Sequence, residues 1–106
     1  MVVLNNRSLG MVRQFQQDYF SGRYQSTVWG YSAPDFATVA RAYGVESLTV
    51  SNPSDTPSAI ERLWRHPDKP FLLQVMLDPM TNVYPKVAFG RPITDMDPPV
   101  ENTFSE

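Results

Sequence analysis

Three short apolar runs along the chain have the pattern of buried strands. Residues 2–4 are all apolar, and residues 71–77 are apolar except for Gln74. A third, β-prone run covers residues 47–50. Continuous apolar runs of this length are typical of strands that are covered on both faces in a parallel sheet. The pattern therefore predicts three strands.

Three other segments repeat apolar residues at the spacing of a helix. The first covers residues 10–20. The second covers residues 36–43 and ends at Gly44, and the third begins at Thr56, a cap residue that is followed by proline. The apolar positions of the three helices are Met11, Phe15 and Tyr19; Phe36, Val39, Ala40 and Tyr43; and Ala59, Ile60, Leu63 and Trp64.

The order of these elements is strand, helix, loop, helix, strand, helix, strand. Such alternation favours right-handed βαβ units, so we expect an α/β fold with a partial parallel sheet of about three strands and flanking helices. We assign residues 1–78 to this part. A sheet this small has open edges, and its first strand starts at residue 2 without a polar lead-in. We therefore expect a piece of a longer domain that associates with itself.

Residues 79–106 differ in character from the rest of the chain. They hold five of the ten prolines and show no apolar period. We interpret them as an extended, Pro-rich C-terminal tail that wraps another surface or is partly disordered.

The composition excludes several classes of function. The chain has 106 residues, no cysteine and a single histidine, His66, so disulfides, thiolate zinc sites, iron–sulfur clusters and multi-histidine metal sites are excluded. A net charge of -2 gives no electrostatic footprint for nucleic acid or for an anionic membrane. We see no membrane span and no signal peptide, and we expect a cytoplasmic protein.

Polar residues lie between the first strand and the first helix. Ligands of open α/β sheets bind beyond the carboxyl ends of the strands, where Asn5, Asn6, Arg7, Ser8 and Gly10 follow residue 4. Free N–H groups at a helix N-terminus bind phosphate, and neutral oxygens suit Mg²⁺ beside a phosphate. These residues fit a phosphate and metal site, but on their own they favour an ordinary turn between strand and helix.

Other polar and aromatic clusters have simpler interpretations. His66 with Arg62 and Arg65 is typical of a solvated helix C-terminus, and Ser8 has no histidine at a spacing that indicates a nucleophile. Asp95 and Asp97 are interpreted as solvated carboxylates. Two aromatic residues of the loop before the second helix fill a core or contact a partner; these are Trp29 and Tyr31.

An ordered set of motifs resembles one enzyme family. Val-Val-Leu-Asn-Asn at residues 2–6, followed by Leu-Gly-Met-Val-Arg-Gln at residues 9–14, looks like the end of the thiamine-diphosphate motif of acetolactate synthase large subunits. That motif opens with Gly-Asp-Gly and closes with Asn-Asn. Further landmarks occur in the same order: Phe20, Gly22, Arg23 and Tyr24; Pro34-Asp35-Phe36, Ala40 and Gly44; Pro70 to Leu73; and Val83 to Val87. The resemblance implies the second half of a thiamine-diphosphate-binding, Rossmann-like domain.

The resemblance also implies roles for five residues. Asn6 would give its side-chain oxygen to Mg²⁺, and Ser8 its backbone carbonyl. Gly10 and Met11 would lie against the diphosphate, and Met11 and Phe15 would face the channel through which 2-keto acids enter. The family usually has tryptophan in place of Phe15, and this position helps to set the preference for the second keto acid. For Met11 and Phe15, the alternative is ordinary helix core.

The activity that the resemblance implies belongs to a larger enzyme. Acetolactate synthases use thiamine diphosphate and Mg²⁺ to decarboxylate pyruvate and condense it with a second 2-keto acid, in branched-chain amino-acid synthesis or in acetoin formation. The implied partners are the missing N-terminal portion of the same enzyme, further copies in a homo-oligomer and a regulatory small subunit. The metal-binding Asp of Gly-Asp-Gly and a cofactor-activating glutamate of the partner subunit lie outside this sequence. We therefore expect that the chain alone neither binds the cofactor tightly nor catalyses.

Two alternatives to this interpretation remain at this point. The chain is similar to a part of other thiamine-diphosphate enzymes of the same superfamily, such as pyruvate oxidase, glyoxylate carboligase and sulfoacetaldehyde acetyltransferase. It could also be a truncated, non-catalytic interaction module. Sequence upstream of residue 1 would distinguish the two, because the Gly-Asp-Gly motif would lie there.

Overall fold

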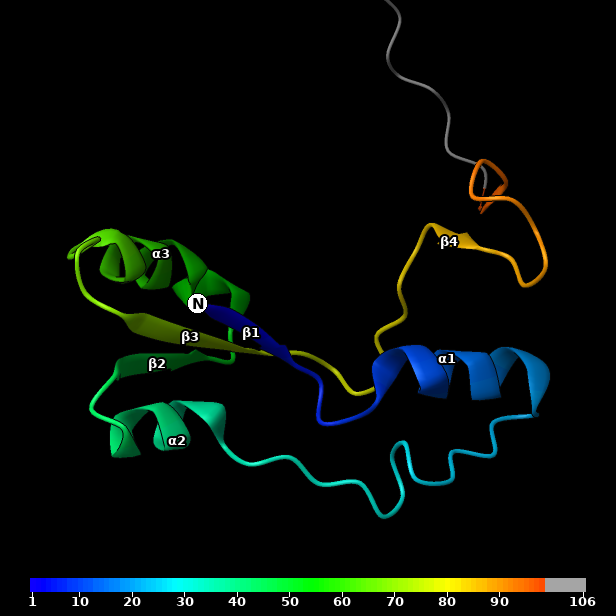
Figure 1. Ribbon diagram of the computed structural model, residues 1–106, viewed down its shortest axis with the longest axis horizontal. Coiled ribbons are helices and arrows are strands. Elements are labelled where there is room, and N and C mark those ends of the chain that lie inside the picture. The colour runs from blue at the N-terminus through cyan, green and yellow to red at the C-terminus, as the bar shows by residue number, and fades with distance from the viewer. Residues whose placement is uncertain (99–106) are drawn as a thin grey trace, which may run out of the picture.

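Three parallel strands lie side by side in the order β1–β3–β2 (Figure 1). They are β1 (Val2–Asn5), β2 (Glu46–Val50) and β3 (Phe71–Met76). In the register of the sheet, Val2 of β1 and Leu48 of β2 both lie beside Leu73 of the central strand. The computed structural model describes residues 1–98, and all structural statements below concern these residues.

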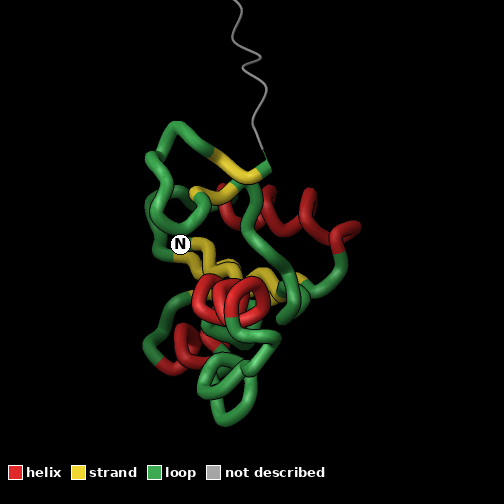
Figure 2. Tube along the Cα trace, turned by 90° about the vertical axis from the view of Figure 1, so that its right-hand side faces the viewer, coloured by secondary structure: helices red, strands yellow, loops and turns green. Residues whose placement is uncertain are grey.

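Two helices cover opposite faces of the sheet (Figure 2). They are α2 (Phe36–Ala42) and α3 (Thr56–Trp64), and α3 connects β2 to its parallel neighbour β3. The buried core lies between α3 and the sheet, because small Ala59 lets the helix approach Val50 and Leu73 closely. The side chains that pack around this core are Leu48, Leu63, Phe71 and Val75.

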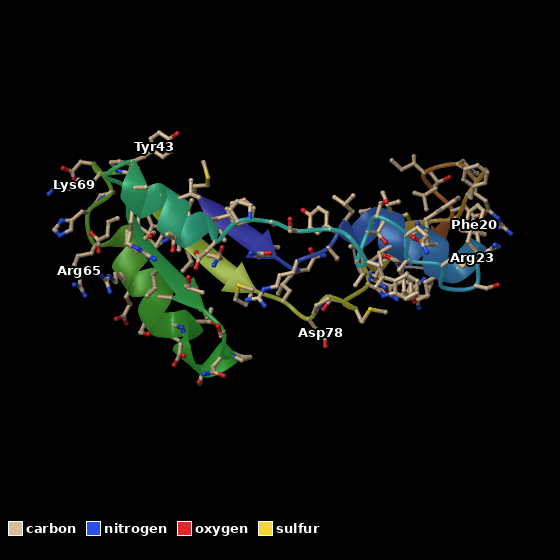
Figure 3. The ribbon with its side chains drawn as sticks, turned by 90° about the horizontal axis from the view of Figure 1, so that it is seen from below. Phe20, Arg23, Tyr43, Arg65, Lys69 and Asp78 are labelled. Atoms are coloured by element: carbon tan, nitrogen blue, oxygen red, sulfur yellow. The ribbon has the colours of Figure 1, made fainter. Side chains whose placement is uncertain are left out.

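The remaining helix, α1 (Gly10–Tyr19), lies beyond the carboxyl ends of the strands and covers neither face of the sheet (Figures 1 and 3). Residues 79–98 return to α1 and include two short antiparallel strands, β4 (Lys86–Val87) and β5 (Met96–Asp97). The radius of gyration is 17.5 Å. A compact domain of this length would have about 13 Å, so the molecule is open and flattened, with extents of 48 × 44 × 23 Å.

The structure confirms the expected α/β class with a three-stranded parallel sheet. One detail of the prediction was wrong: the cap of α3 is Asp55, and Thr56 is already helical. The reason is the 3₁₀ turn Pro53–Asp55, which leads into α3 without a break. The division at residue 78 stays a prediction. Of the expected tail, residues 79–98 contact α1, and residues 99–106 lie outside the described part.

Several apolar side chains of the described residues are not covered. On the edge strand β1, Val2 and Leu4 are 51% and 65% exposed, respectively. On α1, Met11 is 63% exposed. Within residues 1–98, no helix has the length and apolar character that crossing a membrane requires.

Candidate functional site

The residues that follow β1 form a tight polar turn at the end of the sheet. Asn5 Oδ1 accepts a hydrogen bond from the backbone N–H of Arg7 at 3.0 Å, and Asn6 Oδ1 accepts one from Ser8 N–H at 3.2 Å. Arg7 has a positive φ of 52°, which these two side-chain-to-backbone bonds help to hold. Two consecutive asparagine side chains thus hold the backbone of this turn.

Gly10 allows the Asn6 side chain to lie against the first turn of α1. A Cβ atom at position 10 would come within 2.4 Å of Asn6 Nδ2. The preceding residue, Leu9, makes no side-chain hydrogen bond to the helix, and the first turn of α1 has no acidic residue. The N–H groups of this turn therefore lack a side-chain cap, which leaves them suited to an anionic ligand.

The segment that leaves β3 anchors this turn from the other side. Leu77 N–H donates to the carbonyl of Asn5 at 3.0 Å, and the buried hydroxyl of Ser8 donates to the carbonyl of Pro79 at 3.4 Å. Leu9 N–H donates to the carbonyl of Thr27 at 3.1 Å. Hydrogen bonds from separate backbone segments therefore fix the position of the turn.

A buried glutamine connects the turn to the sheet and to α2. Gln74 Oε1 accepts from Phe36 N–H at 2.9 Å and from Asn5 Nδ2 at 3.3 Å. Gln74 Nε2 donates to Thr49 Oγ1 at 3.3 Å and to Asp35 Oδ1 at 3.4 Å. Sequence reasoning missed this residue. The signal was there, because Gln74 is the one polar side chain in the apolar run 71–77.

Asp35 caps α2 next to this network. Its Oδ1 accepts from Thr38 N–H at 3.0 Å, and this hydrogen bond holds the pKa of the Asp35 carboxyl below its usual value, with smaller contributions from Ala37 N–H and the Arg41 charge. A lowered pKa in the folded state means that the ionised cap stabilises the fold.

We expect the stability of the chain to depend on the charge of Asp35 in acid. The contribution is fully present above the carboxyl's unfolded pKa of about 3.9, and it is lost as the pH falls through the lower folded pKa. Asp35→Asn, which keeps a capping oxygen, should therefore flatten the fall in urea midpoint between about pH 4 and pH 2. An identical fall in both proteins would contradict the assignment.

An open, mostly polar cleft of about 400 Å³ lies beside the turn. The cleft is lined by Asn5 and Arg7 of the turn, by Gln74 and Met76 of β3, and by the loop of residues 31–35. Tyr31 thus lies at a cleft, whereas Trp29 is 57% exposed and packs edge-on against Tyr24, with ring centres 6.0 Å apart.

A second, apolar groove of about 420 Å³ lies on α1; we call it the α1 groove. Met11, Gln14, Phe15 and Tyr19 form its helical wall. The Phe15 ring centre lies 4.7 Å from that of Tyr19 and 5.7 Å from that of Phe89. The facing wall comes from the returning segment, with Val83, Pro85, Val87, Phe89 and Met96. The structure therefore brings together Met11 and Phe15, and their role as channel residues stays a prediction.

The donor set of the turn is neutral. Among residues 1–98, no group of three or more His, Asp or Glu side chains is placed to hold a metal ion. Asn6 Oδ1 has a second lone pair beyond its bond to Ser8 N–H, and the Ser8 carbonyl lies next to it in sequence. The turn fits the neutral part of a Mg²⁺–phosphate site, and a carboxylate ligand would have to come from elsewhere.

The other candidates lie away from this turn. His66 lies with Arg62 and Glu46 at the amino ends of the strands, at the far end of the molecule from α1, where Arg65 and Lys69 also lie (Figure 3). Arg62 pairs with Glu46 at 2.9 Å. Asp95 pairs with Arg91 at 2.6 Å, and Asp97 lies opposite Lys86 in the β4–β5 pair.

Comparison with known proteins shows similarity to one group of enzymes. The model of the family described as "Thiamine pyrophosphate enzyme, C-terminal TPP binding domain" matches residues 1–75. The chain is 36% identical over 91 residues to an acetolactate synthase large subunit of Porphyra purpurea, which covers 86% of this chain and 15% of that protein. It is 35% identical over 96 residues to the acetolactate synthase isozyme 2 large subunit of Escherichia coli, covering 91% and 17%, respectively. The chain thus spans about a sixth of the length of these relatives.

Proposed function

Because this chain belongs to the family of C-terminal thiamine-pyrophosphate-binding domains of thiamine pyrophosphate enzymes, we propose that it forms part of the cofactor site of an acetolactate synthase. The observation that carries the proposal is the turn of residues 5–10. Its asparagine side chain lies against an uncapped helix N-terminus, at a glycine that leaves no room for a Cβ atom. An anion and a divalent cation would find complementary groups there.

The turn would bind the polar end of the cofactor. Asn6 Oδ1 and the Ser8 carbonyl supply two neutral oxygens to Mg²⁺, and the N–H groups of Gly10 and Met11 bind the diphosphate. A metal of this kind also needs charged ligands besides phosphate. We infer that a carboxylate from another part of a longer enzyme supplies this charge.

The α1 groove would receive the substrates. Thiamine diphosphate, when bound, supplies the chemistry that decarboxylates pyruvate and joins the product to a second 2-keto acid. Met11 and Phe15 line the groove with apolar surface, which excludes water and orients the second keto acid by its side chain. With phenylalanine in place of the family's usual tryptophan, the groove accepts a different range of side chains.

Several further points belong to the same proposal. The chain works together with the remaining part of such an enzyme, in a homo-oligomer with a regulatory small subunit, in the cytoplasm and in branched-chain amino-acid synthesis. Taken alone, the chain neither binds the cofactor tightly nor catalyses. The uncovered apolar side chains of β1 and α1 support the need for a partner, since large exposed apolar surfaces mark contact sites.

A chimera tests this proposal. This chain would replace the matching segment of the Escherichia coli isozyme 2 large subunit, to which it is 35% identical. We expect the chimera to bind thiamine diphosphate with Mg²⁺ in calorimetric titration and to form acetolactate from pyruvate. The isolated chain in the same titration is expected to show no micromolar binding.

Two results would count against the proposal. A chimera that folds and assembles but binds no cofactor would favour a non-catalytic interaction module. A chimera that binds the cofactor but makes no acetolactate would favour another enzyme of the superfamily, and assays of glyoxylate and sulfoacetaldehyde turnover would then identify it.

A further inference from the structure

Gln14 makes a paired contact with the backbone of the returning segment. The residue is 3% exposed, although it lies on a helix with much uncovered surface. Gln14 Oε1 accepts from Val83 N–H at 2.9 Å, and Gln14 Nε2 donates to the Val83 carbonyl at 3.2 Å. One side chain therefore satisfies both backbone groups of one residue, as a neighbouring strand would.

The adjacent residue, Arg13, holds the two residues before Val83. Its guanidinium is fully buried and donates through Nη2 to the Thr81 carbonyl at 2.7 Å and to Asn82 Oδ1 at 2.6 Å. Nη1 donates to Gln17 Oε1 at 2.8 Å. Two consecutive residues of α1 thus bind three consecutive residues of the returning segment, and they do so through polar groups alone.

The contacts continue one helical turn further along α1. The Asp18 carboxylate pairs with the Lys86 ammonium, and this contact raises the pKa of Lys86 above its usual value. The Lys86 Nζ atom also lies 5.8 Å from the centre of the Tyr84 ring. The segment from residue 81 to residue 86 therefore contacts α1 at both ends, and Gln14 contacts it between these ends, at Val83.

We propose that Gln14 is a positioning residue that sets the width of the α1 groove. Val83, which makes the Gln14 contact, and Pro85, which lies two residues later, line the wall that faces Met11 and Phe15. Arg13 and Asp18 hold the two ends of this segment, and the bidentate amide contact of Gln14 fixes the distance and register of the wall between them. The proposal rests on the function proposed above insofar as the groove selects the side chain of the second 2-keto acid.

The first test uses the chain itself and needs no cofactor. Gln14→Met keeps the length of the side chain and removes both hydrogen bonds. We expect the amide protons of residues 81–87 to exchange with solvent about 10- to 100-fold faster, as the loss of two hydrogen bonds implies. The amides of β3 should exchange at their original rate. Gln25→Met, at an exposed glutamine, is the matched control and should change neither set.

A second variant tests the same contact without a substitution in α1, so that an effect on helix folding can be distinguished. Val83→Pro removes the donor on the segment and leaves the sequence of α1 unchanged, and we expect the same local loss of protection. Trypsin gives an independent readout, because cleavage after Lys86 should accelerate in both variants relative to cleavage after Arg41. Unchanged exchange at residues 81–87 in both variants would overturn the proposal, as would an equal acceleration in β3.

The selectivity part is tested in the chimera. There Gln14→Met should raise the KM for the second 2-keto acid about tenfold, with kcat changed much less, because a wider groove binds its side chain more loosely. If Gln14→Met speeds amide exchange at residues 81–87 but leaves the KM for the second 2-keto acid unchanged, Gln14 has no role in selectivity. A chimera that is inactive from the start would count against the proposed function, whereas the exchange experiment on the chain would still decide the role of Gln14.

Discussion

Replacing Gly10 by alanine is expected to weaken cofactor binding in the chimera about 10- to 100-fold while the chain stays folded. Gly10 lies in α1 without a positive φ, so alanine fits the helix backbone and is a better helix former than glycine. The added Cβ atom would lie 2.4 Å from Asn6 Nδ2 and would push the carboxamide out of the turn. The proposed metal ligand then loses its orientation, while the core is untouched.

A double-mutant cycle identifies the cause of this loss. If Gly10→Ala acts through Asn6, then Asn6→Ala should cost about as much affinity for the Mg²⁺–cofactor pair, and the double variant should cost little more than either. Calorimetric titration of the chimera gives the affinities, and urea denaturation of the chain gives the stabilities. Additive losses, or a Gly10→Ala chain that unfolds, would contradict this explanation.

Gln74→Leu is expected to lower the free energy of unfolding of the chain by about 2 to 4 kcal/mol. Leucine has a similar volume, so little packing is lost. The substitution leaves the Phe36 N–H, the Asn5 carboxamide and the Thr49 hydroxyl without the partner that Gln74 gives them. Of these groups, only Asn5 is buried, and leaving it unpaired costs about 1 to 3 kcal/mol. Phe36 is half-buried and adds less, whereas exposed Thr49 can bind water instead. A domain of this size has only about 5 to 15 kcal/mol in total.

The measurement is urea denaturation followed by far-ultraviolet circular dichroism. Gln25→Leu is the matched control, since that glutamine is exposed, and we expect its effect to stay within about 0.5 kcal/mol. A loss below about 1 kcal/mol in Gln74→Leu would show that the network is weaker than its geometry indicates. We expect the turn of residues 5–8 to loosen first, because Asn5 depends directly on Gln74.

The sheet could be predicted because its strands are recognisable from local sequence alone. Residues 2–4, 47–50 and 71–77 are apolar runs of strand length, and the structure confirms strands at each of them. The Asn5–Asn6 turn followed from the same reasoning, since it comes directly after a strand. The contact between Gly10 and the Asn6 side chain did not follow from it, since only the structure shows that a Cβ atom at position 10 would meet Asn6; the role of Gly10 at the diphosphate stays a prediction.

The position of α1 and of the returning segment could not be predicted from hydropathy. The spacing of Met11, Phe15 and Tyr19 identifies an apolar face, but periodicity does not say what covers that face. In the structure, residues 83–89 lie there instead of the sheet. Arg13 and Gln14 hold this segment by hydrogen bonds to backbone groups. Every residue has such groups, so the sequence does not indicate which of them a side chain will bind.

The pairing of β1 with β3 also sets the order in which the chain can fold. Val2 has its strand partner at Leu73, whereas β2, α3 and β3 are consecutive in the sequence. At synthesis rates of roughly 5 to 20 residues per second, β1 waits several seconds for its partner to be made. During that time the apolar residues 2–4 remain unpaired, and the Asn5–Asn6 turn cannot yet bind Leu77 or Gln74. The proposed cofactor turn is therefore completed only after β3 has been made, although its own residues precede β3 by more than half of the chain.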